Sequence, residues 1–395
     1  MKQVISTENK PIKLWLDDLE NGALEQAKHL ANLPFAFRHI ALMPDAHQGY
    51  GMPIGGVLAA EDVVIPNAVG VDIGCGICAV QTSVQEIEQD SLKKIMGDTR
   101  KRIPVGFNHH KKVQDESFMP DGYAENGLDE LKIVRKEYQA ARKQVGTLGG
   151  GNHFIEIQQG NDGILWLMIH SGSRNLGYKV AHHYNKLAIE LNRKWHSSVP
   201  EKWQLAFLPL DGRKGQDYLQ EMQYCVNFAL VNRRLMMQRV QEVFAEVVSE
   251  VAGEVQFAKM INIAHNYAAL EHHFKKDVVI HRKGATKAYA DQLGIIPGSQ
   301  GTASYIVRGK GEPESFMSCS HGAGRRMGRK QAQKELNLAG EQERLDAIGV
   351  IHGIRHVKDL DEAPGAYKDI SQVMDNQRDL VDIVAELRPL AVIKG

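Results

Sequence analysis

The sequence predicts an α+β fold with central β-sheets and flanking helices, in one interleaved domain over residues 1–395. Short apolar segments that end at a histidine or a glycine turn alternate with amphipathic segments of helical spacing. Site-like motifs extend from Asp45 to Lys394, with neither an internal repeat nor a low-complexity linker between them. Dividing the chain into independent domains would divide this site, so we expect a single domain.

Composition excludes several classes of protein. Lys plus Arg and Asp plus Glu are equal at 48 each, so a polyanionic partner would have to be held by a local basic patch. Four cysteines and no apolar signal segment at the N-terminus fit a reducing cytoplasm. No apolar run approaches the roughly 20 residues of a membrane helix. We therefore expect a cytoplasmic protein without a membrane partner.

The first predicted elements lead into a glycine-rich segment. Residues 16–31 have the apolar spacing of a surface helix, and 37–45 have the character of a strand. The next segment, 46–56, contains four glycines and is expected to be a loop that closely approaches a backbone or a ligand. Asp45 and His47 are candidate metal ligands, although both residue types also flank many glycine turns for local hydrogen-bonding reasons.

The stretch 69–80 carries Asp72 and Cys75 between apolar, β-forming residues. Neighbouring glycines let the backbone bend, so both side chains are expected in the interior, where a strand meets a turn. A buried carboxylate is costly unless it is paired or binds a metal. The alternative is a capping aspartate beside a small buried cysteine.

Three later apolar segments place a histidine at a strand end: His153 after a run of glycines, then His170 and His265. Each of them alone is equally typical of a core histidine. In the predicted strand after His153, Ile155 and Ile157 share one face while Phe154 and Glu156 share the other. The combined oxygen, sulfur and nitrogen donors suit two divalent ions if a thiolate bridges them. This set consists of Asp72, Cys75, His153, His170 and His265.

Helices are expected over 85–100, 129–144, 175–195 and 216–250. The longest has an apolar stripe that we assign to the core, and we interpret Arg233 beside it as a helix-capping cation. A polar segment over 104–128, which contains His109 and His110, is either a mobile substrate flap or a solvated linker.

The segment 316–330 differs in character from the other histidine segments. Hydroxyl residues precede His321, glycines follow it, and a basic helix begins beyond them. Glycines allow a nucleotide to approach closely, and an unprotonated imidazole nitrogen is a covalent nucleophile toward a nucleotide phosphate. In the C-terminal part, a last helix is expected up to Lys394, although the segment keeps apolar strand character to its final residue. We expect Lys394 to be held in place.

Several of these motifs together resemble the RtcB family of RNA ligases, in its bacterial form. They are Met-Pro-Asp-Ala-His (43–47), Val-Asp-Ile-Gly-Cys-Gly (71–76), Gly-Gly-Gly-Asn-His-Phe (149–154), His-Ser-Gly-Ser-Arg (170–174), His-Asn-Tyr (265–267), Ile-Pro-Gly-Ser (296–299), Ser-His-Gly-Ala-Gly-Arg (320–325) and Lys-Gly (394–395). The resemblance covers essentially the whole chain, in the same order.

This resemblance implies GTP- and Mn(II)-dependent joining of an RNA 2′,3′-cyclic phosphate or 3′-phosphate to a 5′-hydroxyl. By family analogy, Cys75 bridges two manganese ions, His321 accepts GMP, and the guanylate then passes to the RNA 3′-phosphate. Asp72 and His153 complete the coordination of one ion, and His170 and His265 complete that of the other. The implied guanylate contacts are Asn152, Phe154, Glu156, Asn266, Lys283, Ser299, Ser304, Ala323, Gly324, Tyr367 and Lys394.

Two other readings of the same residues remain open. A dinuclear metal hydrolase of phosphoesters would use the five metal ligands without a covalent guanylate. An RNA-binding protein with structural metals would need neither His321 nor catalysis. The resemblance leaves open whether the RNA substrate belongs to transfer-RNA splicing or to repair, and whether a protein partner activates turnover.

Overall fold

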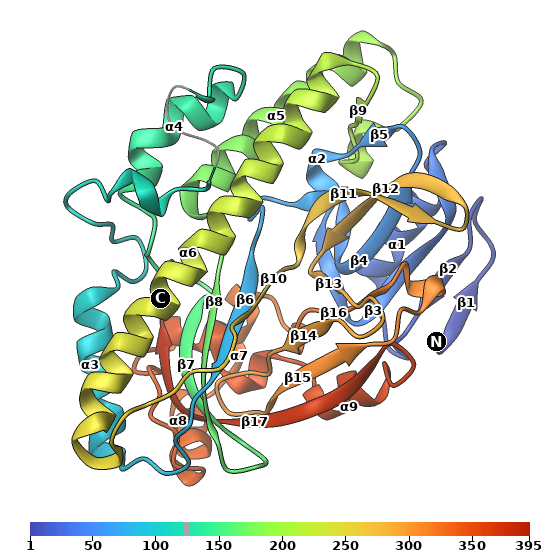
Figure 1. Ribbon diagram of the computed structural model, residues 1–395. Helices are drawn as coiled ribbons and strands as arrows, with labels where there is room; N and C mark the ends of the chain where they lie inside the picture. The colour runs from blue at the N-terminus through green and yellow to red at the C-terminus, as the bar shows by residue number, and fades with distance from the viewer. Residues whose placement is uncertain (122–126) are drawn as a thin grey trace.

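Two large β-sheets dominate the computed structural model, which describes residues 1–121 and 127–395 (Figure 1). The six-stranded sheet contains, in spatial order, β1 (Gln3–Ile5), β2 (Ile12–Leu14), β3 (Ala36–Tyr50), β4 (Met52–Ala60), β12 (Lys276–Lys283) and β11 (Asn266–His273). The seven-stranded sheet contains β10 (Ile261–Ala264), β6 (Gly76–Gln81), β8 (Leu165–Ser171), β7 (Phe154–Gly160), β17 (Val381–Lys394), β15 (Ser304–Gly309) and β14 (Leu293–Ile296). The predicted mixed α and β fold is therefore confirmed.

Short ribbons and helices connect and cover these sheets. The ribbons are β13 (Ala285–Lys287) with β16 (Ser318–Ser320), and β5 (Val63–Val64) with β9 (Leu208–Pro209). The α-helices are α1 (Asn21–Ala31), α2 (Pro66–Val69), α3 (Gln89–Arg102), α4 (Lys132–Arg142), α5 (Arg174–Lys194), α6 (Arg213–Ala252), α7 (Arg329–Glu335), α8 (Leu338–Ala347) and α9 (Ile370–Asp375). The 3₁₀ turns are η1 (Glu116–Phe118), η3 (Glu201–Trp203), η4 (Pro313–Ser315), η5 (Val357–Glu362) and η6 (Pro364–Ala366).

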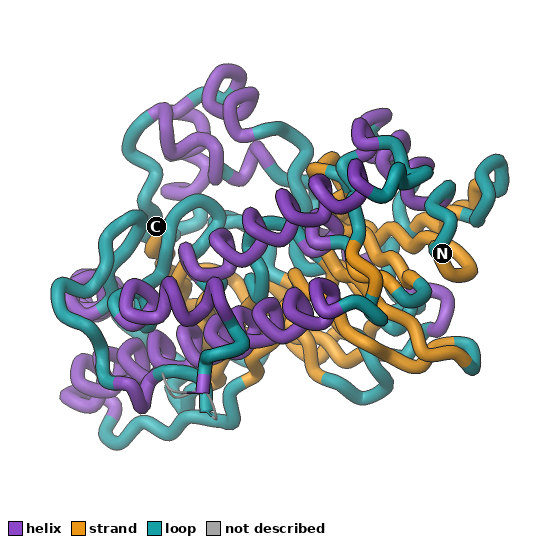
Figure 2. Tube along the Cα trace, turned by 90° about the horizontal axis from the view of Figure 1, so that it is seen from above, coloured by secondary structure: helices purple, strands orange, loops and turns teal. Residues whose placement is uncertain are grey.

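The long helix α6 crosses the seven-stranded sheet and packs on β6, β8 and β10, with α3 and α5 beside it (Figures 1 and 2). Its predicted apolar stripe is confirmed, since Met222, Met237, Val240 and Phe244 are almost completely buried. Ile155 and Ile157 of β7 face this helical layer. Phe154 packs in a different cluster, on the opposite face of the sheet, as the strand period predicts.

Strand register explains why so many motifs meet at one edge of the seven-stranded sheet. Lys394 pairs with Phe154, and Phe154 pairs with His170. His170 in turn pairs with Ile77, and Ile77 with Ile263. One row of partners thus crosses five strands, and the turns next to it carry Cys75, His153 and His265. This row brings together residues that are far apart in the sequence.

Three local predictions need correction. Residues 46–56 are not a loop, because β3 and β4 extend through them as a hairpin with irregular register, and only Gly51 (φ +69°) makes the tight turn. Arg233 is not a helix cap, since it is fully buried in the middle of α6. The expected helix before Lys394 ends early, at Asp375, and the extended strand β17 follows.

The polar segment 104–128 is anchored on one side. Arg239 of α6 donates to His110 Nε2 (3.1 Å) and to Gln114 Oε1 (3.0 Å). Residues 122–126 of this predicted flap or linker lie outside the described residues. Among the described residues, no helix has the length and apolar character that crossing a lipid bilayer requires.

Candidate functional site

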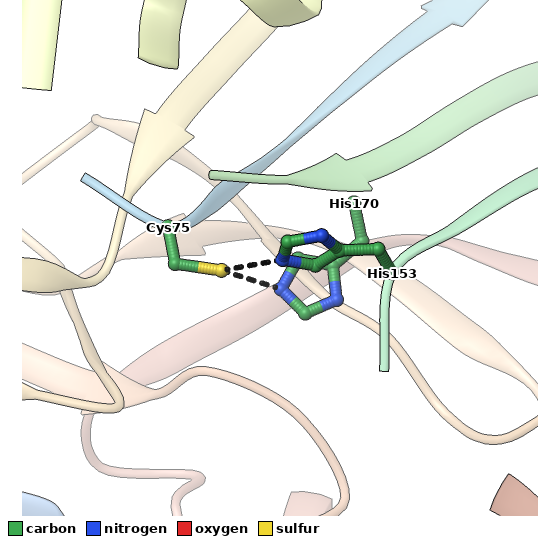
Figure 3. A group of neighbouring side chains, drawn as sticks. All are labelled: Cys75, His153 and His170. Atoms are coloured by element: carbon green, nitrogen blue, oxygen red, sulfur yellow. Dashed lines mark hydrogen bonds between the residues drawn. The ribbon is translucent and has the colours of Figure 1, made fainter. Parts of the chain in front are cut away.

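Cys75 lies at the centre of a buried cluster of donor atoms (Figure 3). Its Sγ is 3.2 Å from His170 Nε2 and 3.5 Å from His153 Nε2. Asp72 Oδ2 is 3.1 Å from the same His153 Nε2. The ligand atoms of Cys75, His153 and His170 all lie within 4.8 Å of one another, so one ion can contact all three.

Backbone carbonyls fix the tautomers of the two imidazoles. His153 Nδ1 lies 3.0 Å from Leu148 O, and His170 Nδ1 lies 3.1 Å from Asn152 O. A carbonyl only accepts, so each Nδ1 carries the proton and each Nε2 presents a lone pair toward Cys75. Burial lowers the pKa of His170 well below its ordinary value, which keeps that ring neutral and able to bind a metal.

The electrostatics of this cluster favour a cation. Burial raises the pKa of the Cys75 thiol well above its usual value, and the Asp72 carboxylate adds to the shift. A bound cation would reverse this effect, because it stabilises a thiolate beside a carboxylate. His265 lies next to the cluster, with its ring centroid 5.2 Å from that of His170. Its buried Nδ1 has no hydrogen-bond partner among the described residues, so it is a free donor atom.

His321 is held beside this cluster by a buried carboxylate. Its ring centroid is 4.7 Å from that of His265, and its Nδ1 is 2.6 Å from Asp45 Oδ2. The His321 backbone amide donates to the same oxygen, 3.2 Å away. In the neutral ring, Nδ1 donates its proton to the carboxylate, so the lone pair is on Nε2. Asp45, considered above as a metal ligand, thus contacts His321.

Helix α6 supports the backbone next to Asp72, Cys75 and His170. Arg233 Nη1 donates to Gly74 O (3.0 Å) and to Ser171 O (2.8 Å), and its Nε donates to Asn262 Oδ1. Asn232 binds backbone groups of Gly146 and Gly172. Adjacent residues of one helix thus satisfy carbonyls beside the cluster.

A cavity of about 220 Å³ opens on one side of His321. Its lining includes eight of the implied guanylate contacts, namely Asn152, Phe154, Glu156, Ser299, Ala323, Gly324, Tyr367 and Lys394. Ser304 lies behind this wall, where its hydroxyl accepts from the Gly298 amide (3.1 Å) and from Gln158 Nε2 (3.1 Å). Burial raises the pKa of Glu156 to about 7, against the opposing effects of Lys394 and Gln158.

A larger cleft of about 810 Å³ opens on the other side of His321. Asp72, Cys75, His265, Asn266 and Lys283 line it together with His321. The cleft places three of the five predicted metal ligands, Asp72, Cys75 and His265, on one surface with the predicted nucleophile.

Two implied guanylate contacts, Asn266 and Lys283, lie in this larger cleft. Asn266 Nδ2 donates to Asp72 O (3.1 Å). Lys283 Nζ donates to the carbonyls of Tyr50 (2.6 Å) and Asn67 (3.0 Å). Burial lowers the pKa of Lys283 to about 7.

Lys394 is held in place, as its apolar surroundings predicted. Its Nζ is 3.1 Å from Glu362 Oε2, and Glu362 also binds Tyr367, Arg325 and Arg329. Although burial opposes ionisation, Lys394, Arg329 and the other partners lower the pKa of Glu362 to about 2. Sequence reasoning did not identify Glu362, because an acid in a polar 3₁₀ segment has no local signal.

Comparisons with known proteins identify the family of this chain. The family model described as tRNA-splicing ligase RtcB matches residues 26–395. The chain is 36% identical to the RNA-splicing ligase RtcB of Escherichia coli, over 100% of this chain and 99% of the relative. It is 32% identical to the tRNA-splicing ligase RtcB of Thermococcus kodakarensis, over 95% and 92% of the two chains. The chain therefore belongs to the RtcB family of RNA-splicing ligases.

Proposed function

We propose that this protein is a GTP- and Mn(II)-dependent RNA ligase that joins a 2′,3′-cyclic phosphate or 3′-phosphate end to a 5′-hydroxyl end. The observation that carries this proposal is the position of His321. Its ring lies between the smaller cavity and the larger cleft, and Asp45 holds its Nδ1 at 2.6 Å. A neutral imidazole fixed in this way can act as a covalent nucleophile.

The first step is attack of His321 Nε2 on the α-phosphorus of GTP. The new bond is N–P, the bond to the β-phosphate oxygen breaks, and pyrophosphate leaves. Asp45 orients the ring and stabilises the positive charge that develops on it, as a carboxylate does for a catalytic histidine. Lys394 and Arg329, which line the smaller cavity, supply positive charge for the phosphates.

The guanylate then activates the RNA. An oxygen of the RNA 3′-phosphate attacks the phosphorus of the histidine-guanylate, and His321 leaves with its lone pair restored. The 5′-hydroxyl of the second strand attacks the 3′-phosphorus, and GMP leaves as the phosphodiester forms. A cyclic phosphate is first opened by water to the 3′-phosphate. Guanylylation is needed because a phosphate monoester lacks a good leaving group.

The buried cluster has the donors that two divalent ions require. We propose that Asp72, Cys75, His153, His170 and His265 would hold two Mn(II) ions. When bound, these ions would neutralise phosphate charge and orient the reacting oxygens. The orphaned Nδ1 of His265 and the proton-free Nε2 atoms of His153 and His170 support this assignment.

We propose that the smaller cavity receives the guanylate. Asn152, Phe154, Glu156, Ser299, Ala323, Gly324, Tyr367 and Lys394 would contact it, Ser304 would support the wall, and Asn266 and Lys283 would act from the larger cleft. We also propose that residues 1–395 act as one cytoplasmic domain, because Asp45 and Lys283 come from one sheet and His170 and Lys394 from the other. The RNA substrate would come from transfer-RNA splicing or from repair.

Labelling with [α-³²P]GTP tests this proposal. Protein incubated with Mn²⁺ should acquire an acid-labile, alkali-stable label, and [γ-³²P]GTP should leave none. His321→Ala should abolish labelling and ligation while the far-UV spectrum is unchanged. Cys75→Ala should abolish both through loss of metal. Phosphodiesterase activity without any label would instead support the hydrolase.

A further inference from the structure

We propose that the Tyr50 ring is a stacking platform for a base of the RNA strand that enters the larger cleft, and that Lys283 positions it. This inference rests on the proposed ligase function and adds a residue that recognises RNA. Tyr50 lies at the tip of the β3–β4 hairpin and lines the cleft that contains Asp72, Cys75 and His321. The residue is 76% exposed, so its ring is accessible to a ligand.

The backbone beneath this exposed ring is fixed at consecutive residues. Gln26 of α1 binds both backbone groups of Gly49, at 2.7 and 3.0 Å. Lys283 Nζ donates to Tyr50 O at 2.6 Å. Gly51 packs so tightly that an added Cβ would lie 2.6 Å from Gln204 O. The tip is therefore rigid, and ring stacking would cost little ordering entropy.

Lys283 connects the tip to the reaction centre. Its ammonium is buried and also donates to Asn67 O in α2, at 3.0 Å. Its backbone pairs with Asn266, the neighbour of His265, across β11 and β12. The lysine therefore connects the hairpin tip to the start of β11, directly after the proposed metal ligand His265. This is a positioning role, exerted through Tyr50.

The chemistry of the cleft favours single-stranded RNA as the occupant. Its lining includes Arg325, Arg326 and Arg329 as well as the hairpin residues. Arg326 Nε donates to Gly365 O, a neutral acceptor that leaves the guanidinium charge available for a phosphate. An aromatic ring together with cations is the usual combination for an unpaired strand, because bases stack while phosphates bind the cations. The base of GTP is assigned to the smaller cavity, which Tyr50 does not line.

Steady-state kinetics with separate RNA strands test the platform. Tyr50→Ala should raise the KM for RNA about 5- to 150-fold, the range expected for loss of one stacked base. Tyr50→Phe should restore it to within about twofold, because a phenyl ring also stacks. Tyr178→Ala is the matched control, since Tyr178 is a 47% exposed tyrosine on α5 that lines neither cavity. In all three variants the GTP labelling of His321 should keep its rate.

Fluorescence distinguishes stacking from general damage. When RNA with 2-aminopurine as the terminal base of either strand binds the unaltered protein, the fluorescence of that base should be quenched. Tyr50→Ala should remove this quenching. Lys283→Met should weaken the quenching. In the double variant Lys283→Met with Tyr50→Ala, the increase in KM should be smaller than the two single increases combined.

Unchanged quenching and KM in Tyr50→Ala would overturn the inference while leaving the ligase intact. A selective loss of GTP labelling in that variant would also overturn it, by assigning the ring to guanine. Absence of labelling in the unaltered protein would instead refute the proposed ligase.

Discussion

At the scale of single residues, the hydrogen bond from His321 Nδ1 to Asp45 decides which imidazole nitrogen is free to react. Asparagine at position 45 is nearly isosteric, but it is neutral and its amide group can donate to the ring. We expect Asp45→Asn to slow His321 guanylylation by about 10²–10⁴-fold without unfolding the protein. Single-turnover labelling with [α-³²P]GTP measures the rate. Asp18→Asn, at an exposed position, is the control, and equal rates for both variants would contradict the role given to Asp45.

Glu156 makes stability depend on pH. Burial raises its folded-state pKa to about 7, from an ordinary value near 4.5. The folded protein therefore binds this proton more tightly than the unfolded chain does, and its contribution to stability is lost as pH rises through about 7. The loss amounts to about 3 kcal/mol at most. Glu156→Gln cannot ionise, so its urea midpoint should rise relative to the unaltered protein between pH 5 and pH 8. Parallel midpoints across that range would show that the buried carboxyl does not titrate there.

At the scale of elements, α6 acts as a support for the metal cluster. Removing the Arg233 guanidinium leaves the carbonyls of Gly74 and Ser171 without their donor. We expect Arg233→Met to lower the free energy of unfolding by about 2–6 kcal/mol, at about 1–3 kcal/mol for each of the two unsatisfied carbonyls. Urea denaturation measures this change. Arg234→Met, at the exposed neighbouring position, should stay within about 0.5 kcal/mol of the unaltered protein. Equal losses in both variants would mean that the buried contacts contribute nothing.

At the scale of elements, the sequence predicts where strands end but not which distant residues contact one another. The strand ends at His153, His170 and His265 were predictable, because apolar runs and glycine turns are local signals. The partners of Asp45, Arg233 and Glu362 were not, because each contact joins residues far apart in the chain. The hairpin over 46–56 was not predicted, because its glycines are typical of a loop. In the structure, the glycines lie in paired strands where the register is irregular.

At the scale of the whole molecule, the hydrophobic clusters lie in both sheets and along α6, and they do not depend on the metal ligands. We therefore expect chelation to abolish ligation while the fold persists. At a free ion concentration of 100–1,000 times the dissociation constant, ion binding would add about 3–4 kcal/mol to the free energy of unfolding. Chelation should therefore lower the melting temperature. Circular dichroism with and without EDTA, followed by Mn²⁺ addition, checks both effects. Unfolding in EDTA would favour the protein with purely structural metals.

The position of β17 also affects how the protein is made. This strand lies between β7 and β15, and Gly160 of β7 pairs with Leu387. A ribosome adds about 5–20 residues per second, so β7 waits roughly 10–45 s for its neighbour to be synthesised. During this time the nascent chain exposes strand edges with unpaired backbone groups, which can pair with strands of other chains. Production of this protein should consequently benefit from slow expression at low temperature or from chaperones that shield such edges.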